Sequence, residues 1–213
     1  MDKKIGFIGC GNMGKAILGG LIASGQVQPG QIWVYTPSPD KVAALRDQYG
    51  INAASSAQEV AQIADIVFGA VKPGIMTKVL GDIASSLNKE SLVVSIAAGV
   101  TLDQLARALG HDRKIIRAMP NTPSLVNAGM TSVTPNALVS SEDVAEVLTM
   151  FRCFGQAHDR FAFALVNLFC SLADLQGQFI GTTEGTDKQR YQQRQHIFHS
   201  LEDIAAGKIS SAR

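Results

Sequence analysis

Short apolar runs alternate with longer segments of mixed polarity through the first 119 residues of the chain. The apolar runs predict strands over residues 4–8, 31–35, 65–71, 92–96 and 114–119. The segments between them carry helix spacing and end signals, after Gly14 and over residues 40–49, 74–87 and 102–109. Near-continuous apolar strands separated by helices are typical of a parallel sheet covered on both faces. The pattern therefore predicts a doubly wound α/β fold with a mostly parallel sheet.

The pattern changes after this series. Residues 130–134 predict an edge strand, and residues 141–152 predict a helix with Ser140 or Ser141 as its N-cap. From Gln156 onward the composition shifts toward Gln and His. We therefore expect one domain over residues 1–155 and an atypical helical segment over residues 156–213.

Two helices are expected in that last segment. Residues 161–175 are mostly apolar and predict a helix packed against the sheet domain or a second subunit. Residues 187–206 predict a mostly polar helix. The apolar stretch falls short of the roughly 20 residues that cross a bilayer, so no membrane span is expected.

Three glycines lie between the first strand and the first helix. Gly9 suits the tight turn, Gly11 has no Cβ to block a phosphate, and Gly14 lets the helix pack against the strand. The helix N-terminus then offers N–H groups and a partial positive charge to an anion. Strand, glycine turn and helix together predict the pyrophosphate site of a Rossmann-type dinucleotide-binding domain.

The end of the second strand bears on the choice of cofactor. An NAD site commonly has an acidic residue there, but this strand runs into Thr36 and Ser38, with Lys41 one helical turn further on. Two hydroxyls and a cation favour the 2′-phosphate of NADP over NAD. Asp40 would repel that phosphate if it turned inward, and we expect it instead to act as the N-cap of the next helix.

Two further loops follow strands at the same predicted edge of the sheet, residues 70–73 and 95–99. Small residues there allow the backbone to approach the ribose and nicotinamide, and Lys72 is either a cation near the phosphates or an exposed loop lysine. The candidate cofactor-binding residues are Ile8, Gly9, Cys10, Gly11, Asn12, Met13, Gly14, Thr36, Ser38, Ala70, Val71, Lys72, Pro73, Ala97 and Ala98.

A catalytic residue is not evident from these motifs. Asn121 stands between Pro120 and Thr122-Pro123 in a stiff loop. Its side chain would orient a substrate or the nicotinamide carboxamide, or it would form a structural Asx-turn. Both interpretations stay open.

Charge and metal-binding residues exclude several other functions. A formal net charge of +1 gives no reason to expect nucleic acid as a partner. Three widely spaced cysteines, Cys10, Cys153 and Cys170, are expected to be reduced thiols, as in a cytoplasmic protein. The first predicted strand begins too early to follow a signal peptide, which also favours the cytoplasm. Cys10 is expected to be a small turn residue rather than a reactive thiol, and the pair His196 and His199 a solvated helix face rather than a metal site.

Four motifs in order carry a more specific resemblance. They are the run Ile5–Gly20, the loop Ala70–Pro73, the segment Ser95–Thr101 and the segment Arg117–Pro123. Together they resemble pyrroline-5-carboxylate reductase of the enterobacterial type, over about residues 1–155. The resemblance implies hydride transfer from NADPH, or less well NADH, to the C=N carbon of 1-pyrroline-5-carboxylate, the last step of proline biosynthesis. It also implies an oligomer built on dimers.

The resemblance stops near Gly155. In the family, a helical domain of more than 100 residues follows, and two loops of it hold the substrate at a dimer interface. Residues 156–213 contain neither loop motif, which is what a shifted or truncated reading frame, or a replaced domain, would produce. The alternative function is therefore a non-catalytic NADP-binding module or an inactive truncated reductase.

Overall fold

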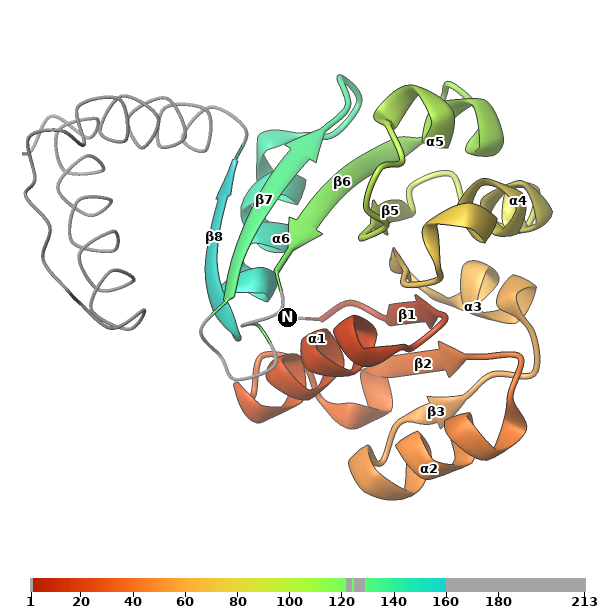
Figure 1. The fold of residues 1–213 in the computed structure, drawn as a ribbon, viewed down its shortest axis with the longest axis vertical. Helices are drawn as coiled ribbons and strands as arrows, with labels where there is room; N and C mark the ends of the chain where they lie inside the picture. Colours follow the sequence, from red (N-terminus) through yellow and green to blue (C-terminus); the bar gives the residue numbers. More distant parts are fainter. Residues whose placement is uncertain (1, 122–123, 125–128, 160–213) are drawn as a thin grey trace, which may run out of the picture. The chain divides into compact units, whose positions relative to one another are not determined.

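A single sheet with helices on both faces forms the part of the chain that the computed structural model describes, residues 2–121, 124 and 129–159 (Figure 1). The strands are β1 (Ile5–Ile8), β2 (Ile32–Tyr35), β3 (Asn52–Ala53), β4 (Ile66–Gly69), β5 (Leu92–Ser95), β6 (Lys114–Pro120), β7 (Gly129–Pro135) and β8 (Gly155–Asp159). The helices are α1 (Asn12–Ala23), α2 (Pro39–Tyr49), α3 (Ala57–Ile63), α4 (Pro73–Ile83), α5 (Leu102–Leu109) and α6 (Ser141–Arg152), with a 3₁₀ turn at Pro29–Gln31.

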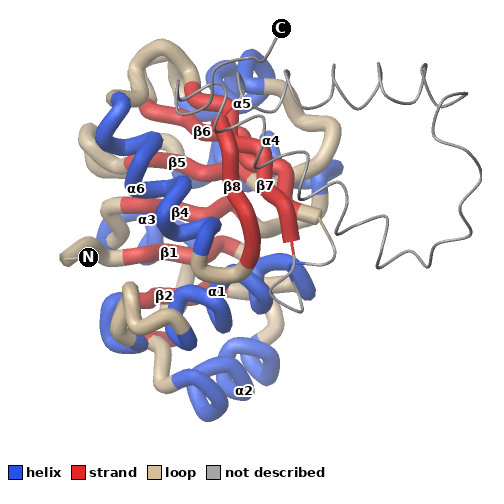
Figure 2. The backbone as a smooth tube through the Cα atoms, turned by 90° about the vertical axis from the view of Figure 1, so that its left-hand side faces the viewer, coloured by secondary structure: helices blue, strands red, loops and turns tan. Residues whose placement is uncertain are grey.

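The strand order is β3-β2-β1-β4-β5-β6-β7-β8. Every pair from β3 to β6 is parallel, β7 runs antiparallel to β6, and β8 runs parallel to β7. Figure 2 shows β2, β1, β4, β5 and β6 following one another across the sheet. This order confirms the predicted doubly wound, mostly parallel fold. The order in which strands are added reverses at β1: β2 and β3 lie on one side of it, and β4 lies on the other. Folds of this kind bind ligands at the carboxyl ends of the two strands that flank such a reversal, here β1 and β4.

Alternate residues of each strand enter different cores, because successive side chains point to opposite faces of a sheet. On one face, Phe7 and Phe68 pack with Leu18 of α1 and Phe151 of α6. On the other face, the buried residues of α3, α4 and α5 form a second cluster. Met76, near the start of α4, belongs to it. Burial on both faces explains why the strands read as unbroken apolar runs.

Aromatic rings connect the central strands to the last described helix. Phe7 stacks on Phe68 with centroids 4.9 Å apart, and Phe68 meets Phe151 edge to face at 6.0 Å. Phe151 in turn meets Phe154 edge to face at 5.6 Å. Because Phe154 also lies where a side chain on Gly20 would stand, the C-terminal end of α6 is fixed against α1.

A hydrogen-bonding side chain marks the start of α6, as the sequence predicts. Ser140 accepts a hydrogen bond from the Asp143 N–H while the Asp143 carboxylate accepts from Ser140, a capping box at the start of α6. Thr101 and Gln104 form the same arrangement at α5. At α2 the prediction was wrong: Ser38 is the N-cap, Pro39 is the first helical residue, and Asp40 lies within the first turn.

The strand order corrects the expectations for the end of this domain. Residues 129–135 form a strand, but it is not an edge strand, because β8 pairs along its outer side. Residues 156–159, expected in a helical segment, belong to β8, where Ala157 is fully buried against α6. The run is short and mostly polar, so its alternation carries little signal. The short elements β3 and α3 were also not expected.

The chain divides into two units, Met1–Asp159 and Arg160–Arg213. The helices predicted over residues 161–175 and 187–206, together with Cys170, His196 and His199, lie outside the described residues. Within the described part of the chain, no helix combines the length and the apolar character that crossing a membrane requires.

Candidate functional site

Backbone hydrogen bonds align the carboxyl ends of four strands. The Gly9 N–H donates to the Tyr35 carbonyl at 2.8 Å, and the Ala70 N–H donates to the Ile8 carbonyl at 2.9 Å. The Ile96 N–H continues the series with the Gly69 carbonyl at 3.2 Å. The predicted loops after β2, β1, β4 and β5 therefore begin side by side at one edge of the sheet.

The glycine turn has the geometry that each of its glycines was expected to supply. Gly9 has φ +78°, and a Cβ there would stand 2.6 Å from Val71 and 2.8 Å from the Ala70 carbonyl oxygen. A Cβ on Gly14 would stand 3.3 Å from the Cβ of Ala70, so α1 packs closely on the end of β4. Beside Gly11, in contrast, a Cβ would meet nothing within 4 Å. The two outer glycines are needed by the fold, and the middle one borders open space.

That open space lies at the start of α1. Gly11 is the N-cap of the helix, no side chain caps it, and no acidic residue lies in its first turn. Gly11 and Asn12 are exposed, whereas Gly9, Cys10 and Gly14 are buried. Because the first N–H groups of a helix lack intrahelical partners and carry partial positive charge, this end is suited to a phosphate.

At the end of β2, the Thr36 hydroxyl already has partners within the turn. Its oxygen donates to the Ser38 carbonyl at 2.9 Å and accepts from the Ser38 N–H at 3.3 Å, and the residue is only 8% exposed. Thr36 thus shapes the turn that begins α2. The half-buried Ser38 and the exposed Lys41 are the two side chains left to meet a 2′-phosphate; their contact with one stays a prediction.

The loops after β4 and β5 differ in character. Lys72 is exposed and serves as the N-cap of α4 without a side-chain capping bond. After β5, the fully buried Ser95 accepts a hydrogen bond from the Ala97 N–H at 3.4 Å and so shapes the loop, a role the sequence did not reveal. Ala97 is buried and Ala98 exposed. The structure brings these residues to the glycine edge, and their contact with a cofactor also stays a prediction.

Asn121 has a structural hydrogen bond. Its side-chain oxygen accepts from the Met130 N–H at 2.8 Å, and its backbone carbonyl accepts from the Ser124 N–H at 3.1 Å. The side chain therefore ties the end of β6 to the start of β7. This geometry supports a structural role, but the bond joins residues nine positions apart and is therefore not the predicted Asx-turn. Only the side-chain NH₂ group of Asn121 is left for a ligand.

Cys10 lies within the glycine turn but is not activated. Burial raises the pKa of its thiol to about 11, and the nearby charge of Lys15 offsets only part of that rise. A reactive cysteine needs a lowered pKa, because the thiolate is the nucleophile. The geometry supports a small turn residue.

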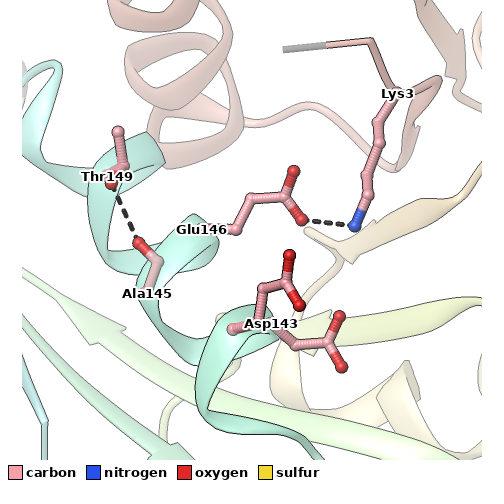
Figure 3. A pocket seen from close by; sticks show the side chains of 6 residues that line it. Lys3, Asp143, Ala145, Glu146 and Thr149 are labelled. Carbon is pink, nitrogen blue, oxygen red and sulfur yellow. Dashed lines mark hydrogen bonds and ion pairs between the residues drawn. The ribbon is translucent and has the colours of Figure 1, made fainter.

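A cavity of about 490 Å³ opens at the other edge of the sheet, near the amino ends of β1 and β6 (Figure 3). It is lined by Lys3, Glu142, Asp143, Ala145, Glu146 and Thr149. Three of its charged groups form ion pairs: Lys3 pairs with Glu146, and Asp143 lies 3.6 Å from Lys114, which is outside the lining. Burial opposes ionisation of Asp143, but the hydrogen bonds from Ser140 and the charge of Lys114 outweigh it and lower its pKa.

This cavity is therefore an ion-paired surface that fastens α6, and it shares no residue with the glycine edge. Among the residues that the structure describes, no three histidine, cysteine or acidic side chains gather to hold a metal ion. The glycine edge remains the candidate site.

Most of the described part of the chain is similar to known proteins. A family model described as NADP oxidoreductase, coenzyme F420-dependent, matches residues 4–99. The pyrroline-5-carboxylate reductase of Escherichia coli (strain K12) is 87% identical over 157 residues, which are 74% of this chain and 58% of that protein. Over this span the chain is similar in sequence to the pyrroline-5-carboxylate reductases. The resemblance carried by the four motifs is thereby confirmed.

More distant pyrroline-5-carboxylate reductases give the same result. The Arabidopsis thaliana protein is 35% identical over 153 residues, 72% of this chain and 55% of that protein. A solved reductase from Coxiella burnetii has a TM-score of 0.71 at 28% identity, covering 100% of this chain and 82% of that one. The Plasmodium falciparum reductase, solved with NADP bound, has a TM-score of 0.68 at 27% identity, over 99% and 80% of the two chains. The chain spans 58% of the length of the first curated relatives it matches.

The open space beside Gly11 gives a first prediction. Gly11→Val should abolish NADPH binding in a fluorescence titration, because two branches of the new side chain would occupy the space that a pyrophosphate needs. The thermal midpoint should change little, since a side chain there meets no neighbour. Gly30→Val is the matched control, because Gly30 also borders open space but lies in the turn before β2. Unchanged NADPH affinity in Gly11→Val would contradict the assignment.

The raised pKa of Cys10 gives a second prediction. With a pKa of about 11, only about one thiol in 10,000 is ionised at pH 7. In a variant carrying Cys153→Ser and Cys170→Ser, iodoacetamide labelling of Cys10 should therefore rise about tenfold per pH unit from pH 7 to 10. Labelling in urea should be fast at pH 8 and serves as the control. A rate that levels off by pH 9 would show that the thiol is not held protonated.

Proposed function

We propose that this chain is a reductase that converts 1-pyrroline-5-carboxylate to proline with NADPH. The observation that carries the proposal is 87% identity to the E. coli reductase over 157 residues, a span about as long as the sheet domain. The structure supports it because β1, β4, β5 and β6, whose carboxyl ends lead into the four motifs, are parallel strands of one sheet that end at the edge holding the glycine turn.

The reaction needs little from the protein beyond position. NADPH supplies a hydride to the ring C=N carbon and a proton adds to the ring nitrogen, giving proline and NADP⁺. A protonated imine is already electrophilic, so orientation and exclusion of water account for most of the catalysis. The first turn of α1 would hold the pyrophosphate, Gly11 would leave space for it, and the small residues Ala97 and Ala98 would leave room for the nicotinamide.

A second candidate function is cofactor binding without turnover. It is favoured by the state of Asn121, whose side-chain oxygen is already hydrogen-bonded to the backbone of β7. The one polar side chain proposed for substrate orientation is thereby partly used for structure. We also propose a homo-oligomer, which the reductase resemblance implies. The widely spaced cysteines support a cytoplasmic location, and the net charge of +1 gives no reason to propose a nucleic-acid partner.

The deciding experiment follows NADPH oxidation at 340 nm by the purified 213-residue chain with 1-pyrroline-5-carboxylate. NADPH binding is titrated on the same sample, with Gly11→Val as the matched control. Turnover in the unmodified chain that is absent from the variant supports the reductase. Binding without turnover would overturn the reductase in favour of the binding module, and absence of binding would overturn both.

The preference for NADPH gives a further prediction. Ser38→Asp should raise the Kd for NADPH at least tenfold relative to that for NADH, because a carboxylate would face the 2′-phosphate. Thr36→Val is the comparison, since the Thr36 hydroxyl is already bonded within the turn, and it should change both affinities alike. If Ser38→Asp leaves the ratio of the two affinities unchanged, the 2′-phosphate does not lie at this turn.

A further inference from the structure

Two large apolar side chains are exposed in the part of the chain that the structure describes: Ile75, at 49%, and Leu138, at 48%. Leu138 lies in the connection between β7 and α6, near the amino ends of the central strands. Ile75 lies in the first turn of α4, where its N–H donates to the carbonyl of the N-cap Lys72 at 3.1 Å. Only Ile75 stands at the edge of the sheet that carries the glycine turn.

The two residues before Ile75 are small or apolar and leave open space beside it. Pro73 is exposed, and a Cβ on Gly74 would meet nothing within 4 Å. The other apolar residues of α4 behave differently: Met76, Leu80 and Ile83 are fully buried in the second core. The exposed isoleucine therefore lies beside the buried stripe of α4, in the turn that follows the loop of Lys72.

The neighbouring loops place this surface relative to the glycine turn. Val71 packs against Gly9, since a Cβ added to Gly9 would lie 2.6 Å from a methyl group of Val71. Both Val71 and Tyr35 are partly buried against the second core, the same core that receives α4. The loop after β4 thus shares an apolar surface with the end of β2, on the side of the sheet that α4 covers.

We propose that Ile75 forms an apolar wall for the adenine ring of the dinucleotide. This inference rests on the proposed function for the identity of the ligand. The adenosine half extends from the pyrophosphate toward the end of β2, where its ribose is bound. The ring that follows the ribose has two apolar faces and needs a surface of that kind beside it, which Ile75 supplies with Val71 and Tyr35. The nicotinamide lies toward the small residues of the loop after β5.

The test compares two halves of the cofactor on Ile75→Ala, Ile75→Leu and Leu138→Ala. The probes are adenosine 2′,5′-bisphosphate for one half and reduced nicotinamide mononucleotide for the other. The Kd of each probe is measured by its competition with bound NADPH. Ile75→Ala should raise the Kd for NADPH and for the bisphosphate by the same factor, about five- to tenfold, since several buried carbon atoms are lost. The affinity of Ile75→Ala for the mononucleotide should stay within about twofold of that of the unmodified chain. Ile75→Leu and the matched control Leu138→Ala should bind both probes and NADPH within about twofold of the unmodified chain.

Each result decides the question. Unchanged bisphosphate affinity in Ile75→Ala, or a loss confined to the mononucleotide, would overturn the inference, as would an equal loss in Leu138→Ala. The proposed reductase is judged separately on the unmodified chain, by whether it binds and oxidises NADPH. If the chain binds NADPH without turnover, the reductase is refuted, and the Kd values of the Ile75 variants still decide the role of Ile75. If the chain does not bind NADPH, both proposals are refuted.

Discussion

The close approach of the glycine turn to the loop after β4 is the constraint on which the site depends. Gly9 and Gly14 lie so near Ala70 and Val71 that neither position has room for a larger side chain without displacement of its neighbours. This contact brings the start of α1 to the reversal point between β1 and β4. Because α1 begins there without a capping side chain or an acidic residue, its N–H groups meet the space beside Gly11 with their partial charge unopposed.

Packing on both faces of the sheet supports that contact. Alternate residues of β1 and β4 enter two separate cores, so each helix layer holds the strand ends from its own side. On one side the rings of Phe7 and Phe68 stack and continue to Phe151. On the other side Val60 of α3 fills the position where a side chain on Gly6 would stand. The strands that carry the turn are therefore held by two packed layers.

Much of this arrangement was predictable because it depends on local patterns. The apolar runs gave the strands from β1 to β6 apart from β3, and the three glycines gave the turn, because each pattern is set by residues within a few positions. The sequence did not reveal β8, since five mostly polar residues become a strand only through pairing with β7 and packing of Ala157 on α6. Asp40 has the chemistry of an N-cap, but Pro39 is the first helical residue, so the N-cap is Ser38, two residues before Asp40.

Side-chain partners explain the remaining differences at the site. The hydroxyl of Thr36 and the amide oxygen of Asn121 both look available in the sequence, yet backbone groups of the turn and of β7 already engage them. Such hydrogen bonds depend on φ and ψ angles that no spacing rule supplies. Ile75 was overlooked for a similar reason: an apolar residue in a helix is expected to be buried, and only the orientation of α4 shows that this one is not.

The placement of the first strand at the centre of the sheet has a consequence for how the domain is made. β1 needs β4, about 60 residues later, to complete its pairing, and Lys3 finds Glu146 across 143 residues of chain. The aromatic rings that close the first core end at Phe154. Contacts of such long range slow folding, because loop-closure entropy is lost before they form. During synthesis on the ribosome, α1 can cover part of the first core early, but the part that Phe151 and Phe154 complete stays exposed until α6 has left the exit tunnel.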